Sequence, residues 1–112
     1  MLAILHGSQT TGHIHEHSDW DVGILADHTL SHAERSDLRR TFASKLNVSE
    51  DAVDIADLRS DAPLLRYRVA MQGRLIEGDP QEFRKFQIEA WKDYLNNEKM
   101  FALRTAFLNK AL

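Results

Sequence analysis

The sequence predicts a small α/β (α+β) domain in which helices pack against one mixed β-sheet. Its length of 112 residues suits a single domain spanning 1–112. Hydrophobic residues make up 43% and charged residues 28%, which is typical of a globular protein rather than a disordered one. Short apolar segments alternate with longer segments of helical periodicity, and this alternation predicts the mixed sheet.

The first half of the chain predicts two strands and a helix. Residues 2–5 and 20–25 are short apolar runs, and the polar residues between them predict a loop or one helical turn. Ser31 and Glu34 match a capping box, in which each side chain accepts a hydrogen bond from a backbone amide of the first helical turn. A helix is therefore expected over 32–46, with apolar residues on one face and a stop at Asn47.

The second half continues the alternation. Its expected elements are a strand over 52–58, a helix from Pro63 to Gly73, a strand over 74–77 and a helical segment over 81–112. Asn96 and Asn97 could break the last segment into two helices. Its aromatic stripe is expected to be core where the helix crosses the sheet: Phe83, Phe86, Trp91 and Tyr94.

Composition excludes several classes of protein. The absence of cysteine excludes a disulfide scaffold and thiolate chemistry, and it favours a reducing compartment, so we expect a cytoplasmic location. A net charge of −3 gives no reason to expect direct binding to nucleic acid. The apolar runs are too short to cross a bilayer, so no membrane association is expected.

Three aspartates and a Gly-Ser turn carry the chemistry. Asp19 and Asp21 lie on one face at the start of the second strand, and such close carboxylates repel each other unless a cation lies between them. Asp54 lies on the polar face of the third strand and joins them if that strand pairs beside the second. Three carboxylates suit Mg²⁺, and two such ions can support phosphoryl transfer. Gly7 allows close approach of a phosphate, and Ser8 offers donors to it.

The pattern of several other polar residues predicts a function less specifically. His13, His15 and His17 alternate along the first loop and could form a metal site, but a solvated loop is the favoured interpretation. Arg66 and Arg68 follow the third strand and could contact a triphosphate or an acidic patch of a partner. We assign Arg66 to nucleotide binding, with ordinary surface charge as the alternative.

The pattern Gly7-Ser8, ten residues, Asp19-x-Asp21 resembles the signature of the nucleotidyltransferase superfamily that includes DNA polymerase beta. The short chain and the segment 62–76 resemble the minimal nucleotidyltransferases, or MNT proteins. This resemblance covers roughly residues 2–95 and implies the polymerase beta-like fold.

MNT proteins are usually paired with a HEPN-domain RNase in a toxin–antitoxin system, and members transfer AMP from ATP to a tyrosine of the toxin. The resemblance therefore implies an antitoxin with protein adenylyltransferase (AMPylation) activity, ATP as substrate, Mg²⁺ as cofactor and a HEPN toxin as partner in a hetero-oligomer. It implies that Asp19 and Asp21 are metal ligands, Asp54 is the third carboxylate, and Gly7 with Ser8 forms the triphosphate-binding turn. The apolar helical tail 97–112 is expected to contact the partner.

The sequence departs from the family pattern in three ways. Relatives usually have a helix before the first strand, so either that helix is lost or this start lies later. Gln9 stands where relatives often have a basic residue, and histidines replace the arginines of the loop. Two other functions stay open: neutralisation of the toxin by binding alone, and transfer of a nucleotide to a small molecule. Clustered carboxylates disfavour the first alternative, and the short chain disfavours the second.

Overall fold

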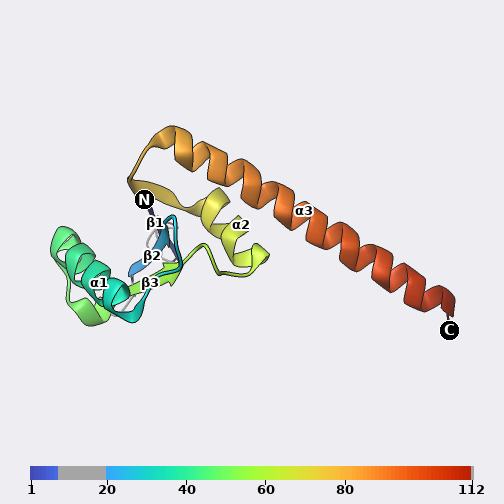
Figure 1. Cartoon of the computed structure of the whole chain (residues 1–112), viewed down its shortest axis with the longest axis horizontal. Coiled ribbons are helices and arrows are strands. Elements are labelled where there is room, and N and C mark those ends of the chain that lie inside the picture. The colour runs from blue at the N-terminus through green and yellow to red at the C-terminus, as the bar shows by residue number, and fades with distance from the viewer. Residues whose placement is uncertain (8–19, 112) are drawn as a thin grey trace.

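Four strands form one mixed sheet (Figure 1). The computed structural model describes residues 1–7 and 20–111, and for most residues beyond 97 it describes the helix but not the side chain. The strand order is β3-β2-β1-β4, with β1 antiparallel to β2 and β4, and β2 parallel to β3. The strand bounds are Leu2–His6 for β1, Trp20–Leu25 for β2, Val53–Asp57 for β3 and Arg74–Glu77 for β4. The mixed sheet expected from the sequence is confirmed.

Three helices connect or follow these strands. α1 (His32–Leu46) lies between β2 and β3, α2 (Pro63–Gln72) lies between β3 and β4, and α3 (Pro80–Ala111) follows β4. A short 3₁₀ turn, η2 (Glu50–Ala52), precedes β3 and was not expected from the sequence, because three residues carry too little periodicity to reveal it. None of the described helices is long and apolar enough to cross a membrane.

The ends of α1 follow local sequence rules. The Ser31 hydroxyl accepts a hydrogen bond from the Glu34 amide (3.2 Å), and the Glu34 carboxylate accepts one from the Ser31 amide (3.1 Å). This is the expected capping box. At the other end, Asn47 adopts the left-handed conformation, with a φ of 57°, and its amide donates to carbonyls of the last turn.

The side chains of β1 alternate between two cores, one on each face of the sheet. Ala3 and Leu5 belong to the core covered by α1, which contains Phe42. Leu2 and Ile4 belong to the core covered by α2 and α3, which includes Val69, Ala70, Phe86 and Ala90. The candidate residues of β2 and β3 can therefore be assigned to a face by the same alternation.

α3 corrects two expectations. It is a single helix of 32 residues, so Asn96 and Asn97 do not break it. Asparagine costs a helix only a few tenths of a kcal/mol relative to alanine, far less than proline does. Trp91 is 47% exposed and is not core, because it is rotated by about 100° from the buried Ala90. The C-terminal part of α3 projects beyond the sheet (Figure 1), so one dimension of the molecule is 56 Å and the others are 31 and 26 Å.

Candidate active site

Two of the three predicted carboxylates lie side by side. Asp21 on β2 and Asp54 on β3 are paired directly in the parallel register of these strands, whose backbones lie about 4.8 Å apart. The neighbouring Val22, Val53 and Ile55 are in the core under α1, so alternation directs both aspartates toward the face that α2 and α3 cover. The expected juxtaposition of Asp21 and Asp54 is confirmed.

Both aspartates line a cavity of about 380 Å³, a size that accommodates a small-molecule ligand. The strands and the turn after β1 contribute one part of its lining: His6, Gly7, Asp21, Asp54 and Ala56. α2 contributes the other part: Leu65, Arg68 and Gln72. The cavity therefore combines two carboxylates, a glycine backbone and one arginine.

The backbone at Gly7 requires glycine for two reasons. Its φ of +87° lies in a region that other residues adopt only with strain. A Cβ atom at this position would also collide with Oδ2 of Asp21. The turn is thus packed directly against one of the two paired carboxylates, and its backbone is open to the cavity.

His6 is a cavity residue that the sequence reasoning missed. It pairs with Asp21 across β1 and β2, and it shares the face of Leu2 and Ile4 by alternation. Burial lowers the pKa of His6, against the opposing effect of Asp21, Asp61 and Asp54, so the neutral imidazole is favoured at neutral pH. Its Nε2 atom is buried and has no hydrogen-bond partner among the described residues. Strand alternation from the apolar Leu2 and Ile4 could have assigned His6 to this face of the sheet.

The two arginines of α2 have different surroundings. Arg66 faces α3, where its Nη1 atom lies 3.4 Å from Oδ2 of Asp93 and its guanidinium lies 5.6 Å from the centre of the Phe86 ring. Arg66 is not among the described residues that line the cavity, whereas Arg68 is. Side chains two residues apart on an α-helix point in directions that differ by about 160°. This difference explains why Arg66 faces α3 while Arg68 lines the cavity. Binding of a nucleotide by Arg66 would require it to leave Asp93.

A family comparison agrees with this geometry. The model of the family described as polymerase beta, nucleotidyltransferase matches residues 1–82. The chain belongs to this nucleotidyltransferase family. The match contains all four strands and α2, and therefore every residue named above as lining the cavity.

Similar proteins come from toxin–antitoxin systems. The protein adenylyltransferase MntA of Shewanella oneidensis is 34% identical over 93 residues, which cover 83% of this chain and 65% of that protein. The crystal structure of a toxin–antitoxin complex with AMP-PNP matches 99% of this chain and 85% of the other, with 32% identity and a TM-score of 0.74. A structure of tri-AMPylated Shewanella oneidensis HEPN toxin with MNT antitoxin matches 99% of this chain and 82% of the other, with 29% identity and a TM-score of 0.66.

The described part of this chain holds two of the predicted metal ligands, Asp21 and Asp54. Asp19, Ser8 and the three loop histidines, His13, His15 and His17, lie outside the described residues. Within the described ranges no group of three His, Cys, Asp or Glu side chains could hold a metal ion. Asp21 and Asp54 nevertheless fit a Mg²⁺ site in their chemistry, because they present oxygen ligands from neighbouring strands to one open cavity. The expected role of Asp19 as a metal ligand beside them stays a prediction.

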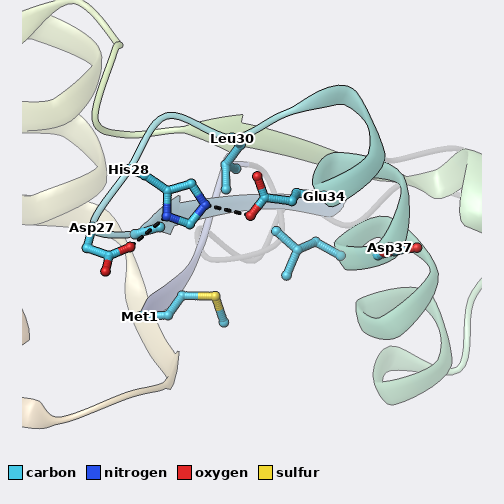
Figure 2. A pocket seen from close by; sticks show the side chains of 8 residues that line it. Met1, Asp27, His28, Leu30, Glu34 and Asp37 are labelled. Carbon is cyan, nitrogen blue, oxygen red and sulfur yellow. Dashed lines mark hydrogen bonds and ion pairs between the residues drawn. The ribbon is translucent and has the colours of Figure 1, made fainter.

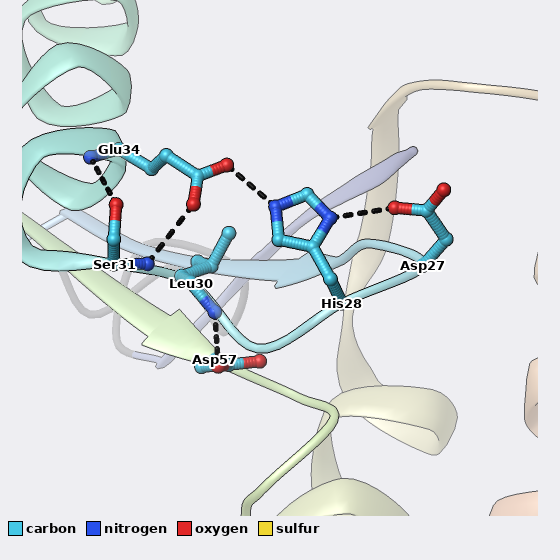
Figure 3. A network of polar contacts seen from close by, with 6 residues as sticks. All are labelled: Asp27, His28, Leu30, Ser31, Glu34 and Asp57. Carbon is cyan, nitrogen blue, oxygen red and sulfur yellow. Dashed lines mark hydrogen bonds and ion pairs between the residues drawn. The ribbon is translucent and has the colours of Figure 1, made fainter.

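A second cavity, of about 420 Å³, lies at the opposite end of β2, beside the start of α1 (Figure 2). In its lining, His28 lies between two carboxylates, with Nδ1 2.6 Å from Asp27 and Nε2 2.6 Å from Glu34. Glu34 also belongs to the capping box of α1 (Figure 3). These polar groups engage one another and the backbone, so we assign them to structure rather than to catalysis.

Asp57 anchors the same region from β3. It is 1% exposed, and it accepts hydrogen bonds from the amides of Leu30 (3.0 Å) and Arg59 (3.1 Å). The bond to Leu30 joins the end of β3 to the segment before α1 (Figure 3). Asp57 thus satisfies two backbone donors, which is what a buried carboxylate needs in order to be stable there.

Proposed function

We propose that this chain is a protein adenylyltransferase that transfers AMP from ATP to a hydroxyl of a HEPN-domain toxin and so acts as its antitoxin. The observation that carries the proposal is the register pairing of Asp21 with Asp54 in a cavity that also contains the Gly7 turn. Membership of the nucleotidyltransferase family and similarity to MntA support the reaction type. The chain spans 65% of the Shewanella MntA, so activity and partner belong to the proposal.

The proposed reaction is a displacement at the α-phosphorus of ATP. The acceptor hydroxyl oxygen forms a bond to this phosphorus while the bond to the bridging oxygen breaks, and pyrophosphate leaves. The hydroxyl proton passes to a carboxylate oxygen of the site, where Asp54 is an exposed candidate. Asp21 and Asp54, with Asp19, would hold Mg²⁺, for which we propose two ions. The metal would offset the phosphate charge and favour the deprotonated acceptor.

The turn after β1 would hold the triphosphate. Gly7 exposes its backbone to the cavity, and we propose that Ser8 contributes an amide and a hydroxyl to the phosphates. The acceptor would be a tyrosine of the toxin, as the family resemblance implies, and the helical tail 97–112 would contact this partner in a hetero-oligomer. A negatively charged AMP group on the toxin would repel RNA phosphates from its catalytic pocket.

Intact-mass spectrometry of the cognate HEPN protein tests the proposal. After incubation with this chain, ATP and Mg²⁺, the partner should gain the mass of one or more AMP units, and omission of either ATP or Mg²⁺ should prevent the gain. Asp21→Asn should abolish transfer, whereas the exposed Asp51, outside the described cavity lining, offers a matched control in Asp51→Asn. An unchanged partner mass, with neutralisation only at a stoichiometric ratio, would favour binding alone.

A further inference from the structure

One face of α2 closes part of the candidate cavity. Leu65, Arg68 and Gln72 line it and follow one another at intervals of three and four residues, the spacing of a single helical face. The rest of the lining comes from the strands and the turn after β1. A ligand held by Asp21 and Asp54 would therefore have this face of α2 as a neighbour.

Arg68 is the one lysine or arginine among the described residues that line the cavity. Its side chain is exposed, and it makes no hydrogen bond or ion pair in the part of the chain that the structure describes. Two other arginines differ from it: Arg66 is paired with Asp93, and Arg35 donates to the carbonyl of Ile55 (3.4 Å). Among the described residues, the guanidinium of Arg68 therefore has no contact that a ligand would displace.

The cavity holds charges of both signs on separate elements. Asp21 and Asp54 on the strands provide the negative charge, and Arg68 on α2 provides the positive charge. Among the described residues, no ion pair joins Arg68 to either aspartate, so Arg68 does not neutralise them by direct contact. A ligand that contains both a divalent cation and an anionic chain would match both sides at once, and a magnesium-bound polyphosphate has this charge arrangement.

We infer that Arg68 binds the polyphosphate chain of the nucleotide, an inference that rests on the proposed function and deepens it. A planar guanidinium can donate two parallel hydrogen bonds to phosphate oxygens, and a charged donor binds a charged acceptor more strongly than neutral groups do. Arg68 thus takes the role that the sequence reasoning gave to Arg66, which is engaged with α3. Its role is to position the phosphates against the metal-binding carboxylates.

Calorimetric titration with Mg²⁺-ATP and with Mg²⁺-tripolyphosphate tests this inference. Arg68→Gln should weaken the binding of both ligands by about 10- to 100-fold, because it removes charged hydrogen bonds. Arg68→Lys should lie between wild type and Arg68→Gln, because lysine keeps the charge but loses the paired geometry. Arg84→Gln is the matched control, since Arg84 is an exposed arginine of α3 that lines a different hollow, and it should bind both ligands as wild type does.

The outcomes separate the inference from the proposed function. A wild-type protein that binds Mg²⁺-ATP and an Arg68→Gln variant that binds it equally well would overturn the role of Arg68 alone. Equal binding of Mg²⁺-ATP together with a loss of AMP transfer by Arg68→Gln would indicate that Arg68 contacts an acidic patch of the acceptor protein. That outcome would also overturn the inference. Weakened binding of ATP without weakened binding of tripolyphosphate would place Arg68 at the nucleoside. A wild-type protein that binds no Mg²⁺-ATP would overturn the proposed function, and this inference with it.

Discussion

The two ends of β2 use similar side chains in different ways. Where β2 leads into α1, Asp27, His28 and Glu34 form a chain of contacts, and Asp57 accepts two backbone hydrogen bonds. Where β2 begins, Asp21 lines a cavity beside Asp54, and His6 has a buried nitrogen without a hydrogen-bond partner in the part of the chain that the structure describes. The first end connects secondary-structure elements, and the second presents polar groups to a cavity.

The difference shows that neither residue type nor cavity size identifies the site. The cavity beside His28 and the candidate site are similar in size, at about 420 Å³ and about 380 Å³. The cavity beside His28 also contains acidic residues and a histidine. What distinguishes the candidate site is that its carboxylates lie side by side on paired strands, next to a turn that only glycine fits. Substitutions at the two ends should therefore have different effects on activity and on stability.

Asp54 and Asp57 offer the strongest test, because they lie three residues apart on the same strand. Asp54→Asn should lower the rate of AMP transfer by on the order of 10³-fold, since it removes a metal ligand. Its stability should be unchanged or slightly higher, because repulsion from Asp21 is relieved. Single-turnover transfer of radiolabelled AMP to the partner measures the rate. A near wild-type rate would remove Asp54 from the site.

Asp57→Asn should have the opposite effect, with a lower stability and an unchanged rate of AMP transfer. An asparagine places an amide group against one of the two backbone donors that Asp57 now satisfies, and this should cost about 1–3 kcal/mol of unfolding free energy. The transfer rate per folded molecule should stay close to that of wild type. Urea denaturation followed by circular dichroism measures the stability. A stable Asp57→Asn variant that has lost activity would contradict the assignment of this end to structure.

Gly7 and Gly78 provide a second pair, since both have positive φ values, +87° and +119°, and a Cβ at either would meet close neighbours. Alanine at either position should cost about 1–3 kcal/mol in backbone strain. Only Gly7→Ala should also weaken the binding of Mg²⁺-ATP, because its Cβ would displace Asp21. At Gly78 the neighbours are Met1 and Leu2, at the opposite end of β1. Equal ATP affinities of the two variants, measured by calorimetry, would make the Gly7 turn purely structural.

The local features at both ends of β2 could be predicted from the sequence. The capping box of Ser31 and Glu34 and the strand alternation at Asp54 depend on neighbours within a few residues, and both were readable from spacing. The pairing of Asp21 with Asp54 needed one further assumption, that β3 lies beside β2, and the structure confirms it.

Features set by contacts between distant elements were harder to predict. Spacing alone could not distinguish Arg66 from Arg68, because the choice depends on where α3 packs against α2. The exposure of Trp91 depends on the same packing, which buries Phe86 and Ala90 but leaves Trp91 off the contact stripe. His6 was missed because it belongs to an apolar strand, and its role depends on the aspartates of two other strands.

The smallest predicted effect concerns the pH dependence of the contacts of His28, at the end of β2 that leads into α1. Both ring nitrogens of His28 lie 2.6 Å from carboxylates, and an imidazole can donate from both only when it is protonated. Hydrogen bonds to Asp27 and Glu34 raise the pKa of His28, and the hydrogen bond from His28 lowers the pKa of each carboxyl group. The network therefore stabilises the fold most between the ordinary carboxyl range, about 4, and the ordinary histidine value, about 6.5.

This stabilisation is lost as the pH rises through the raised pKa of His28, and also as the pH falls through the lowered pKa values of Asp27 and Glu34. The melting temperature of wild type should exceed that of His28→Gln by more at pH 5.5 than at pH 8.5. His32→Gln, which changes another exposed histidine at the start of α1, is the control and should show no such difference. Added salt should reduce the effect, since the network is exposed to solvent. A difference between wild type and His28→Gln that is the same at both pH values would mean that the protonated form of His28 contributes nothing to the fold.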